Sequence, residues 1–160
     1  MSTPNILMTR IDNRLIHGQV GVTWTNSLGA NLVVVANDEV ATDPVVQTLM
    51  DMVISDGVQT RYFTLQKMIE VIHKAADRQK IFIVCKTPKD VLTLVRGGVP
   101  IKFVNIGNMH FVEGKKQIHT TVSVDNRDIS AFCELRDLGI RCEIRRVPNE
   151  TGIDIFKLIK

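Results

Sequence analysis

No stretch of the sequence is apolar for long enough to cross a membrane, since a spanning helix needs about 20 consecutive apolar residues. The opening residues also lack the basic start and the apolar core of a secretory signal peptide. These two absences favour a cytoplasmic protein. The length of 160 residues predicts a single domain, 1–160.

Cysteine and aromatic residues are scarce as well. The three cysteines, Cys85, Cys133 and Cys142, form no Cys-x-x-Cys pair, so their spacing suggests neither a zinc site nor a disulfide framework. Each is expected to be a small buried apolar residue. Aromatic residues make up 5% of a chain that is 44% hydrophobic, which predicts an aliphatic core.

Clustered positive charge is missing, although the formal net charge is +3. Runs of lysine or arginine never exceed two residues. A surface that binds nucleic acid usually carries a denser basic stripe, with aromatic side chains on which bases stack. We therefore expect no nucleic-acid partner.

The short motifs of several enzyme classes are absent too. The glycine-rich patterns GxxxxGK[ST] and GxGxxG do not occur, which leaves nucleotide-binding folds without support. The hydrolase pattern GxSxG and the metalloprotease pattern HExxH are also missing. A metal site built on His17 and His110 would lack a third ligand. We expect neither a cofactor nor a metal.

What the sequence does contain is a regular alternation of β-branched runs and amphipathic segments. Such alternation favours a parallel sheet wrapped by helices, and the chain is too short for an eight-fold barrel. We predict an α/β fold with an open, mostly parallel seven-stranded sheet and helices on both faces. The predicted strands are 5–11, 31–36, 58–63, 80–85, 102–107, 117–124 and 140–147. The predicted helices are 18–29, 43–57, 65–76, 87–98, 126–139 and 151–159.

Three unusually polar loops follow strands of this predicted sheet. They are the His17 loop (residues 12–17), Lys86-Thr87, and the segment 107–117. In an open parallel sheet, ligands bind outside the carboxyl ends of the strands. The three loops are therefore expected on one rim, where they meet if their strands are neighbours.

The His17 loop carries the chemistry that a phosphoryl carrier needs. His17 opens a predicted helix, whose free N–H groups favour an anion and keep the imidazole neutral. Arg10 and Arg14 add permanently charged donors that suit phosphate oxygens. Asp12 can orient either arginine or accept the ring N–H of His17, and Gly18 allows a close approach to the ring.

Other interpretations of the same residues remain open. The loop fits a capped turn with weak surface ion pairs equally well. A regulatory domain that binds a small anion or a nucleotide without a covalent step would have the same rim. In a purely structural subunit the loops would serve a homodimer, with Trp24 as its anchor, although Trp24 also fits the inner face of the first helix. His73 and His119 are interpreted as structural or surface residues.

Three segments resemble a known family. "TRIDNRLIHGQVGVTW" is similar to the N-terminal signature of the mannose/fructose/sorbose-type IIB components of the bacterial sugar phosphotransferase system (PTS). "VNIGNMHFVEGKKQI" and "KTP" resemble two further active-site loops of that family. The similarity extends over essentially the whole chain, and the wording is closest to the N-acetylgalactosamine or galactosamine branch.

The resemblance implies a histidine phosphocarrier whose carrier residue is His17, phosphorylated at Nδ1. A IIA component, itself supplied by the phosphocarrier HPr, would donate the phosphoryl group. His17 would then transfer it to a sugar that enters through the membrane components IIC and IID. Arg14 would clamp the phosphate, with Arg10 and Asp12 supporting the loop. The residues expected to close the pocket are Lys86, Thr87, Gly107, Asn108 and His110. The resemblance also suggests a free IIB component rather than a fused one.

Overall fold

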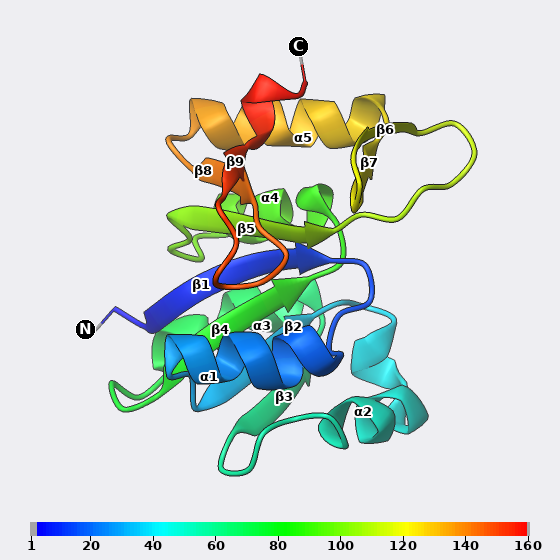
Figure 1. Ribbon diagram of the computed structural model, residues 1–160. Helices are drawn as coiled ribbons and strands as arrows, with labels where there is room; N and C mark the ends of the chain where they lie inside the picture. Colours follow the sequence, from blue (N-terminus) through cyan, green and yellow to red (C-terminus); the bar gives the residue numbers. More distant parts are fainter. Residues whose placement is uncertain (1–2, 160) are drawn as a thin grey trace.

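A seven-stranded sheet runs through the middle of the computed structural model, which describes residues 3–159 (Figure 1). The strand order is β3-β2-β4-β1-β5-β8-β9, and all neighbours are parallel except the pair of β8 and β9. The strands are β1 (Asn5–Asp12), β2 (Leu32–Ala36), β3 (Gln59–Phe63), β4 (Lys80–Cys85), β5 (Phe103–Asn108), β8 (Arg141–Ile144) and β9 (Ile153–Asp154). The predicted fold class is confirmed.

Helices cover both faces of the sheet. One face carries the π-helix η1 (Gln19–Trp24), which continues directly into α1 (Thr25–Leu28), together with α2 (Pro44–Asp51) and the 3₁₀ turn η2 (Val40–Thr42). The other face carries α3 (Leu65–Val71) with its 3₁₀ extension η3 (Ile72–Lys74), α4 (Pro88–Arg96) and α5 (Asn126–Asp137). No helix within residues 3–159 is long and apolar enough to span a bilayer.

Local sequence signals set the starts of several helices. Asp43 and Thr87 each accept a backbone N–H of the first turn, and each is followed by a proline at the first helical position. Asp125 and Asp128 form a reciprocal capping box at the start of α5. Because α2 and α4 follow parallel strands, their starts lie at the same edge of the sheet as the carboxyl ends of those strands.

The core consists of two aliphatic layers, one on each side of the sheet. Central strands are buried on both faces, and Leu32–Ala36 is buried along its whole length. Cys85 and Cys142 are buried, as predicted, whereas Cys133 is only half-buried. Burial raises the pKa of the Cys85 thiol well above its ordinary value, so this residue stays neutral.

Two of the predicted elements are wrong. The segment 117–124 is not a strand of the sheet but a separate antiparallel hairpin of β6 (Lys116–His119) and β7 (Val122–Val124). The chain reverses between them, where the ring Nδ1 of His119 accepts the backbone N–H of Thr121. This turn breaks the run of residues with high β-propensity that suggested one continuous strand.

The predicted terminal helix 151–159 is also incorrect. Its first part forms β9, which pairs with β8 and supplies the seventh strand, and only η4 (Ile155–Lys157) is helical. Gly152 permits this close pairing, because a Cβ there would lie on the Glu143 side chain. Pairing with an edge strand therefore overrides the apolar spacing that suggested a helix.

Candidate functional site

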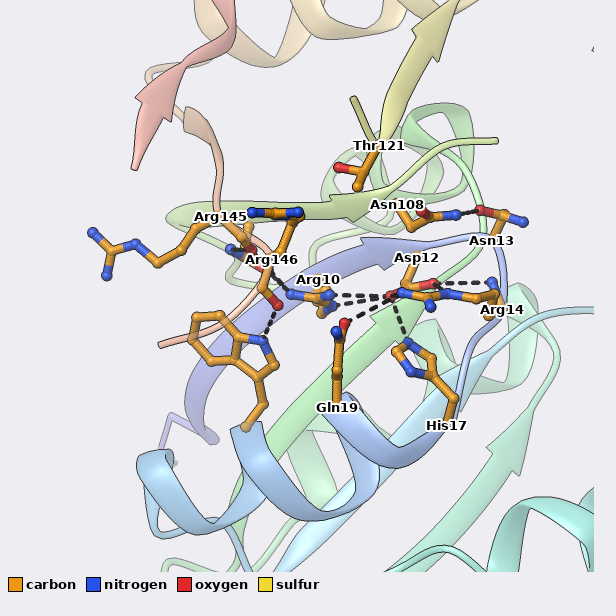
Figure 2. Close-up of polar contacts among 12 residues, drawn as sticks. Arg10, Asp12, Asn13, Arg14, His17, Gln19, Asn108, Thr121, Arg145 and Arg146 are labelled. Carbon is orange, nitrogen blue, oxygen red and sulfur yellow. Dashed lines mark hydrogen bonds and ion pairs between the residues drawn. The ribbon is translucent and has the colours of Figure 1, made fainter. Parts of the chain in front are cut away.

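The site lies at the carboxyl end of β1, the strand between β4 and β5. The three polar loops follow these three adjacent strands, so they share one rim as expected. Met8 of β1 packs in the core layer on the side covered by η1, and Arg10 and Asp12 lie between β1 and that helix (Figure 2). The centre of the site is therefore a polar cluster between a sheet and a helix.

Asp12 is the residue on which the other side chains converge (Figure 2). Its carboxylate is fully buried. Oδ1 accepts from the backbone N and from Nε of Arg14 at 3.0 and 3.2 Å. Oδ2 accepts from Nε and Nη2 of Arg10 at 3.3 and 3.1 Å, and from Nη2 of Arg14 at 3.3 Å. The same Oδ2 lies 2.8 Å from Nε2 of His17.

The charged neighbours keep Asp12 ionised despite its burial. Burial by itself raises the pKa of the carboxyl, but the hydrogen bonds from His17 and Arg14 and the charge of Arg10 outweigh it. Together they lower the pKa from 3.8 to about 2. Asp12 is therefore a carboxylate at neutral pH and can only accept hydrogen bonds.

The ionised carboxylate determines the tautomer of His17. Because Asp12 cannot donate, the hydrogen between the two residues belongs to Nε2 of the imidazole. A neutral ring then keeps its lone pair on Nδ1. The side chain of His17 is 19% exposed, so the ring lies at the surface of the site rather than in hydrocarbon. The arrangement leaves Nδ1 free to act as a nucleophile.

The two arginines occupy opposite environments. Arg10 is fully buried; its Nη1 donates to Oδ1 of Asn105 at 2.6 Å and to the carbonyl of Arg145 at 3.1 Å, and its guanidinium lies 5.4 Å from the ring centroid of Trp24. Arg14 has a side chain that is 44% exposed, with a long contact of 3.4 Å to Oε1 of Gln19. Arg10 is thus fixed, while Arg14 can reach a ligand beside His17.

The backbone of the His17 loop turns sharply at Leu15. This residue has a φ of 59°, a left-handed conformation that is uncommon without glycine. Its N–H donates to the carbonyl of Asp12 at 2.9 Å, and its side chain is buried together with that of Ile16. Burial of these two apolar side chains holds the strained turn in place and leaves Arg14 and His17 on either side of Asp12.

Asn13 connects the His17 loop to the segment after β5. Its backbone N–H donates to the carbonyl of Asn108 at 3.0 Å. Its Oδ1 accepts from the side-chain amide of Asn108 and from the backbone N–H of His110, the latter at 3.2 Å. The structure therefore brings Asn108 and the backbone of His110 to the site, whereas the His110 residue itself is exposed.

Gly107 and Gly18 have different surroundings. Gly107 lies within β5, where a Cβ would stand 1.9 Å from Nη2 of Arg10, so only glycine leaves room for that guanidinium. A Cβ at Gly18 would meet nothing within 4 Å, so the chain's own packing does not require glycine there.

Lys86 and Thr87 lie at the same rim of the sheet, but they do not belong to the polar cluster around Asp12. The hydroxyl of Thr87 accepts the N–H of Asp90 and caps α4. Neither residue has a hydrogen bond or an ion pair with His17, Asp12 or Arg14 in the described part of the chain. Their expected part in closing the pocket therefore stays a prediction. Within residues 3–159, no three His, Cys, Asp or Glu side chains are grouped as metal ligands would be.

Four contributors were not identified from the sequence: Asn13, Gln19, Asn105, and Trp24 as a site residue. Trp24 is buried, and its indole N–H donates to the carbonyl of Arg146 at 2.9 Å, so it packs on the inner face of the helix and is not an exposed anchor for a homodimer. Asn105 is 95 residues from Arg10 and becomes its neighbour only through strand pairing. Asn13, Gln19 and Trp24 lie within the segment 9–24 and Asn105 within 104–118, so the resemblance to the family was the available signal for all four.

Known proteins are similar to this chain along its whole length. Residues 6–160 match the family described as "PTS system sorbose subfamily IIB component". The N-acetylgalactosamine-specific phosphotransferase enzyme IIB component 2 of Escherichia coli (strain K12) is 60% identical over 156 residues, which cover 98% of this chain and 99% of the relative. The PTS system mannose-specific EIIAB component of the same strain is 40% identical over 153 residues, covering 95% of this chain and 47% of that longer protein.

Solved structures agree with these sequence matches. The crystal structure of a PTS-dependent N-acetyl-galactosamine IIB component from Streptococcus pyogenes superposes with a TM-score of 0.93 at 43% sequence identity. The superposition covers 99% of this chain and 100% of the other.

Proposed function

Because this chain belongs to the sorbose subfamily of PTS IIB components, which are phosphocarriers in sugar uptake, we propose that His17 is the residue that receives the phosphoryl group. The observation that carries the proposal is the 2.8 Å contact between Nε2 of His17 and the buried carboxylate of Asp12. This contact leaves Nδ1 as the nucleophilic nitrogen of a partly exposed ring.

The transfer proceeds in two displacements. The lone pair of Nδ1 attacks the phosphorus of the phosphohistidine on a IIA component, a new N–P bond forms, and the N–P bond of the donor breaks. The hydrogen stays on Nε2 of His17 and remains hydrogen-bonded to Asp12, so the positive charge that develops on the ring is stabilised by an adjacent carboxylate. In the second displacement a sugar hydroxyl attacks the same phosphorus, an O–P bond forms and the N–P bond to His17 breaks. The hydroxyl proton passes to water, and the bonding pair returns to Nδ1 of neutral His17.

Arg14 is the proposed phosphate clamp. Its guanidinium is partly exposed and is held beside His17 by the Asp12 carboxylate. A dianionic phosphoryl group on Nδ1 would compete with Asp12 for these donors, and an arginine suits phosphate oxygens because it offers several N–H groups in one plane. Arg10 is buried and fully engaged below Asp12, so it supports the carboxylate and does not reach the phosphoryl group.

PTS IIB components work with a IIA component and with membrane IIC and IID components. For this chain we propose a IIA phosphohistidine as donor, since a mannose-specific relative is an EIIAB protein of which this chain covers 47%. The proposed sugar is N-acetylgalactosamine, on the basis of the relative that is 60% identical. The corresponding reaction class is that of a phosphohistidine–sugar phosphotransferase.

Intact mass spectrometry tests the acceptor residue. Incubation with phosphoenolpyruvate, enzyme I, HPr and a cognate IIA component should add the mass of one phosphoryl group, and acid should remove it. His17→Ala should abolish the addition, whereas His73→Ala, a matched change on an exposed 3₁₀ turn, should not. A phosphoryl group that persists in His17→Ala would reject the assignment. Reversible phosphate binding without covalent mass would favour the alternative of a non-covalent anion-binding domain.

Arg14→Ala tests the clamp. The variant should fold, because the side chain of Arg14 is 44% exposed and the buried Asp12 carboxylate keeps its bonds to Arg10. Its rate of phosphoryl acceptance should fall on the order of 10²-fold, in keeping with the loss of one charged donor at a transferring group. Stopped-flow or quench measurements of both half-reactions would check this, and unchanged rates in both would exclude Arg14 from the mechanism.

A further inference from the structure

Asn105 has no hydrogen bond with His17 or Asp12 in the part of the chain that the structure describes. It lies on β5, directly opposite Arg10 of β1 in the parallel pairing, and it is 1% exposed. Its Oδ1 accepts from Nη1 of Arg10 at 2.6 Å, and its Nδ2 donates to the carbonyl of Arg145 at 3.0 Å. The same carbonyl accepts from Nη1 of Arg10 at 3.1 Å. One amide therefore ties the guanidinium of Arg10 to the end of β8.

The other residues packed around Arg10 leave its guanidinium little room to move. The Trp24 ring covers it, and Gly107 lies so close that a Cβ at that position would overlap Nη2. Asn105 is the only side-chain acceptor, apart from the Asp12 carboxylate, that the described residues present to Arg10. Without that acceptor, the buried Nη1 of Arg10 would keep only one hydrogen-bond partner, the carbonyl of Arg145.

The position of Arg10 affects that of His17 through one atom, Oδ2 of Asp12. Nε and Nη2 of Arg10 both donate to Oδ2 of Asp12, and Oδ2 is also the atom that accepts from Nε2 of His17. A tilt of the guanidinium would consequently rotate or shift the carboxylate oxygen on which the imidazole depends. The series of contacts runs from Asn105 to Arg10, then to Asp12, and ends at His17.

We infer that Asn105 is a positioning residue for phosphoryl transfer, which acts through Arg10 and Asp12 to hold His17 in the tautomer with a free Nδ1. The inference rests on the proposed role of His17. A merely structural role for Asn105 would affect the stability of the fold but would leave the tautomer of a ring three contacts away unchanged.

The test compares two substitutions at this position. Asn105→Leu has a similar volume but offers no acceptor. Asn105→Asp keeps an oxygen for Nη1 of Arg10. Asn31→Leu is the control, because the side-chain amide of Asn31 also uses both its oxygen and its nitrogen, here on Lys80 and Arg78, at the start of β4 and just before it. Asn105→Ser, whose shorter side chain leaves space for a water molecule, replaces the leucine variant if that variant does not fold.

The first readout is the pair of ¹⁵N chemical shifts of the His17 ring, which needs no phosphoryl donor. The wild type and Asn31→Leu should show one tautomer with the hydrogen on Nε2, and Asn105→Leu should show a mixture. The second readout is phosphorylation by phospho-IIA. The maximal rate of Asn105→Leu should fall about tenfold with an unchanged half-saturating donor concentration, since a small misplacement of a reacting group lowers the rate and not the docking. Asn105→Asp should restore both values toward those of the wild type.

An unchanged tautomer in Asn105→Leu would overturn the inference, as would an equal change in Asn31→Leu or a failure of Asn105→Asp to restore the shifts. The positioning role of Asn105 and the proposed function of His17 can be rejected independently of each other. If Asn105→Leu disturbs the tautomer but the wild type cannot be phosphorylated, the positioning role stands and the proposed function falls.

Discussion

Two regions at the carboxyl edge of the sheet differ in organisation. The first, which we call the hairpin cavity, has a volume of about 1190 Å³ and lies among the start of α4, the segment 112–116, the β6–β7 hairpin, the start of α5 and residues 158–159. Among its lining side chains, the ion pair recorded is that of Lys115 with Asp128, at 3.0 Å. Around the His17 loop, by contrast, the donors of three side chains converge on one buried carboxylate.

The contrast shows that a cavity does not by itself mark the site that we propose for phosphoryl transfer. Catalysis of phosphoryl transfer depends on positioning and on charge, and both require groups whose orientation is fixed by other groups. The cluster at His17 fixes a tautomer and a nucleophilic nitrogen. In the hairpin cavity, the Asp128 carboxylate accepts from Lys115 and from the backbone N–H of Asp125, and within residues 3–159 no histidine bonds to it. Four measurements would sharpen or break this contrast.

The largest effect is expected for Asp12→Asn. An amide in this position would leave the charge of Arg10 buried without its partner, which costs about 3–5 kcal/mol of unfolding free energy. It would also be able to donate to Nε2 of His17 and so favour the wrong tautomer, for which a loss on the order of 10³-fold or more in transfer rate is expected. Denaturant unfolding and the phosphorylation assay would measure the two effects. A stable, active variant would show that convergence on Asp12 has no consequence.

Gly107→Ala should have the next largest effect on stability. The added Cβ would overlap the guanidinium of Arg10, which cannot move into solvent because it is fully buried. Overpacking of this kind costs about 1–3 kcal/mol. Gly18→Ala is the matched control for stability, since a Cβ there meets nothing within 4 Å and the backbone is helical. Thermal unfolding of both variants would check the prediction, and equal stabilities would contradict the close packing at Gly107.

Acid should remove part of the stability through Asp12. The pKa of this group is about 2 in the folded protein and 3.8 ordinarily, so its contribution is present above pH 4 and is lost as the pH falls toward 2. The difference corresponds to about 2 kcal/mol. Denaturant titrations between pH 5 and pH 2 would show this decline in the wild type, and if Asp12→Asn folds, its decline should be smaller by that amount. An equal loss of unfolding free energy in the two proteins would contradict the low pKa of Asp12.

The smallest effect is expected in the hairpin cavity. Lys115→Met removes the ion pair with Asp128, whose side chains are 21% and 11% exposed. Such a pair near the surface is worth about 1 kcal/mol or less. The rate of phosphoryl acceptance should not change. A large loss of transfer in this variant would mean that the hairpin cavity belongs to the working site and would end the contrast between the two regions.

The sequence alone predicted the site unevenly. His17, Arg14 and Asp12 lie within six residues of each other, so their proximity could be inferred before any tertiary structure was known. The side chain of Arg14 is 44% exposed, which agrees with its expected part as a phosphate clamp. Asn105 and the Arg145 carbonyl could not be found in this way, because they meet Arg10 only through the pairing of β1 with β5 and of β5 with β8.

Local signals in the sequence were sufficient for the α/β class, for the buried aliphatic strands and for the capped starts of α2 and α4, because side-chain caps and apolar spacing act over a few residues. The fate of 117–124 and of 151–159 depended on which partners those segments met, and Asp12 could have accepted from one arginine, from both, or from the histidine. Only the tertiary structure decided these points, since hydrogen bonds between distant segments form according to strand order and burial, and neither property is local.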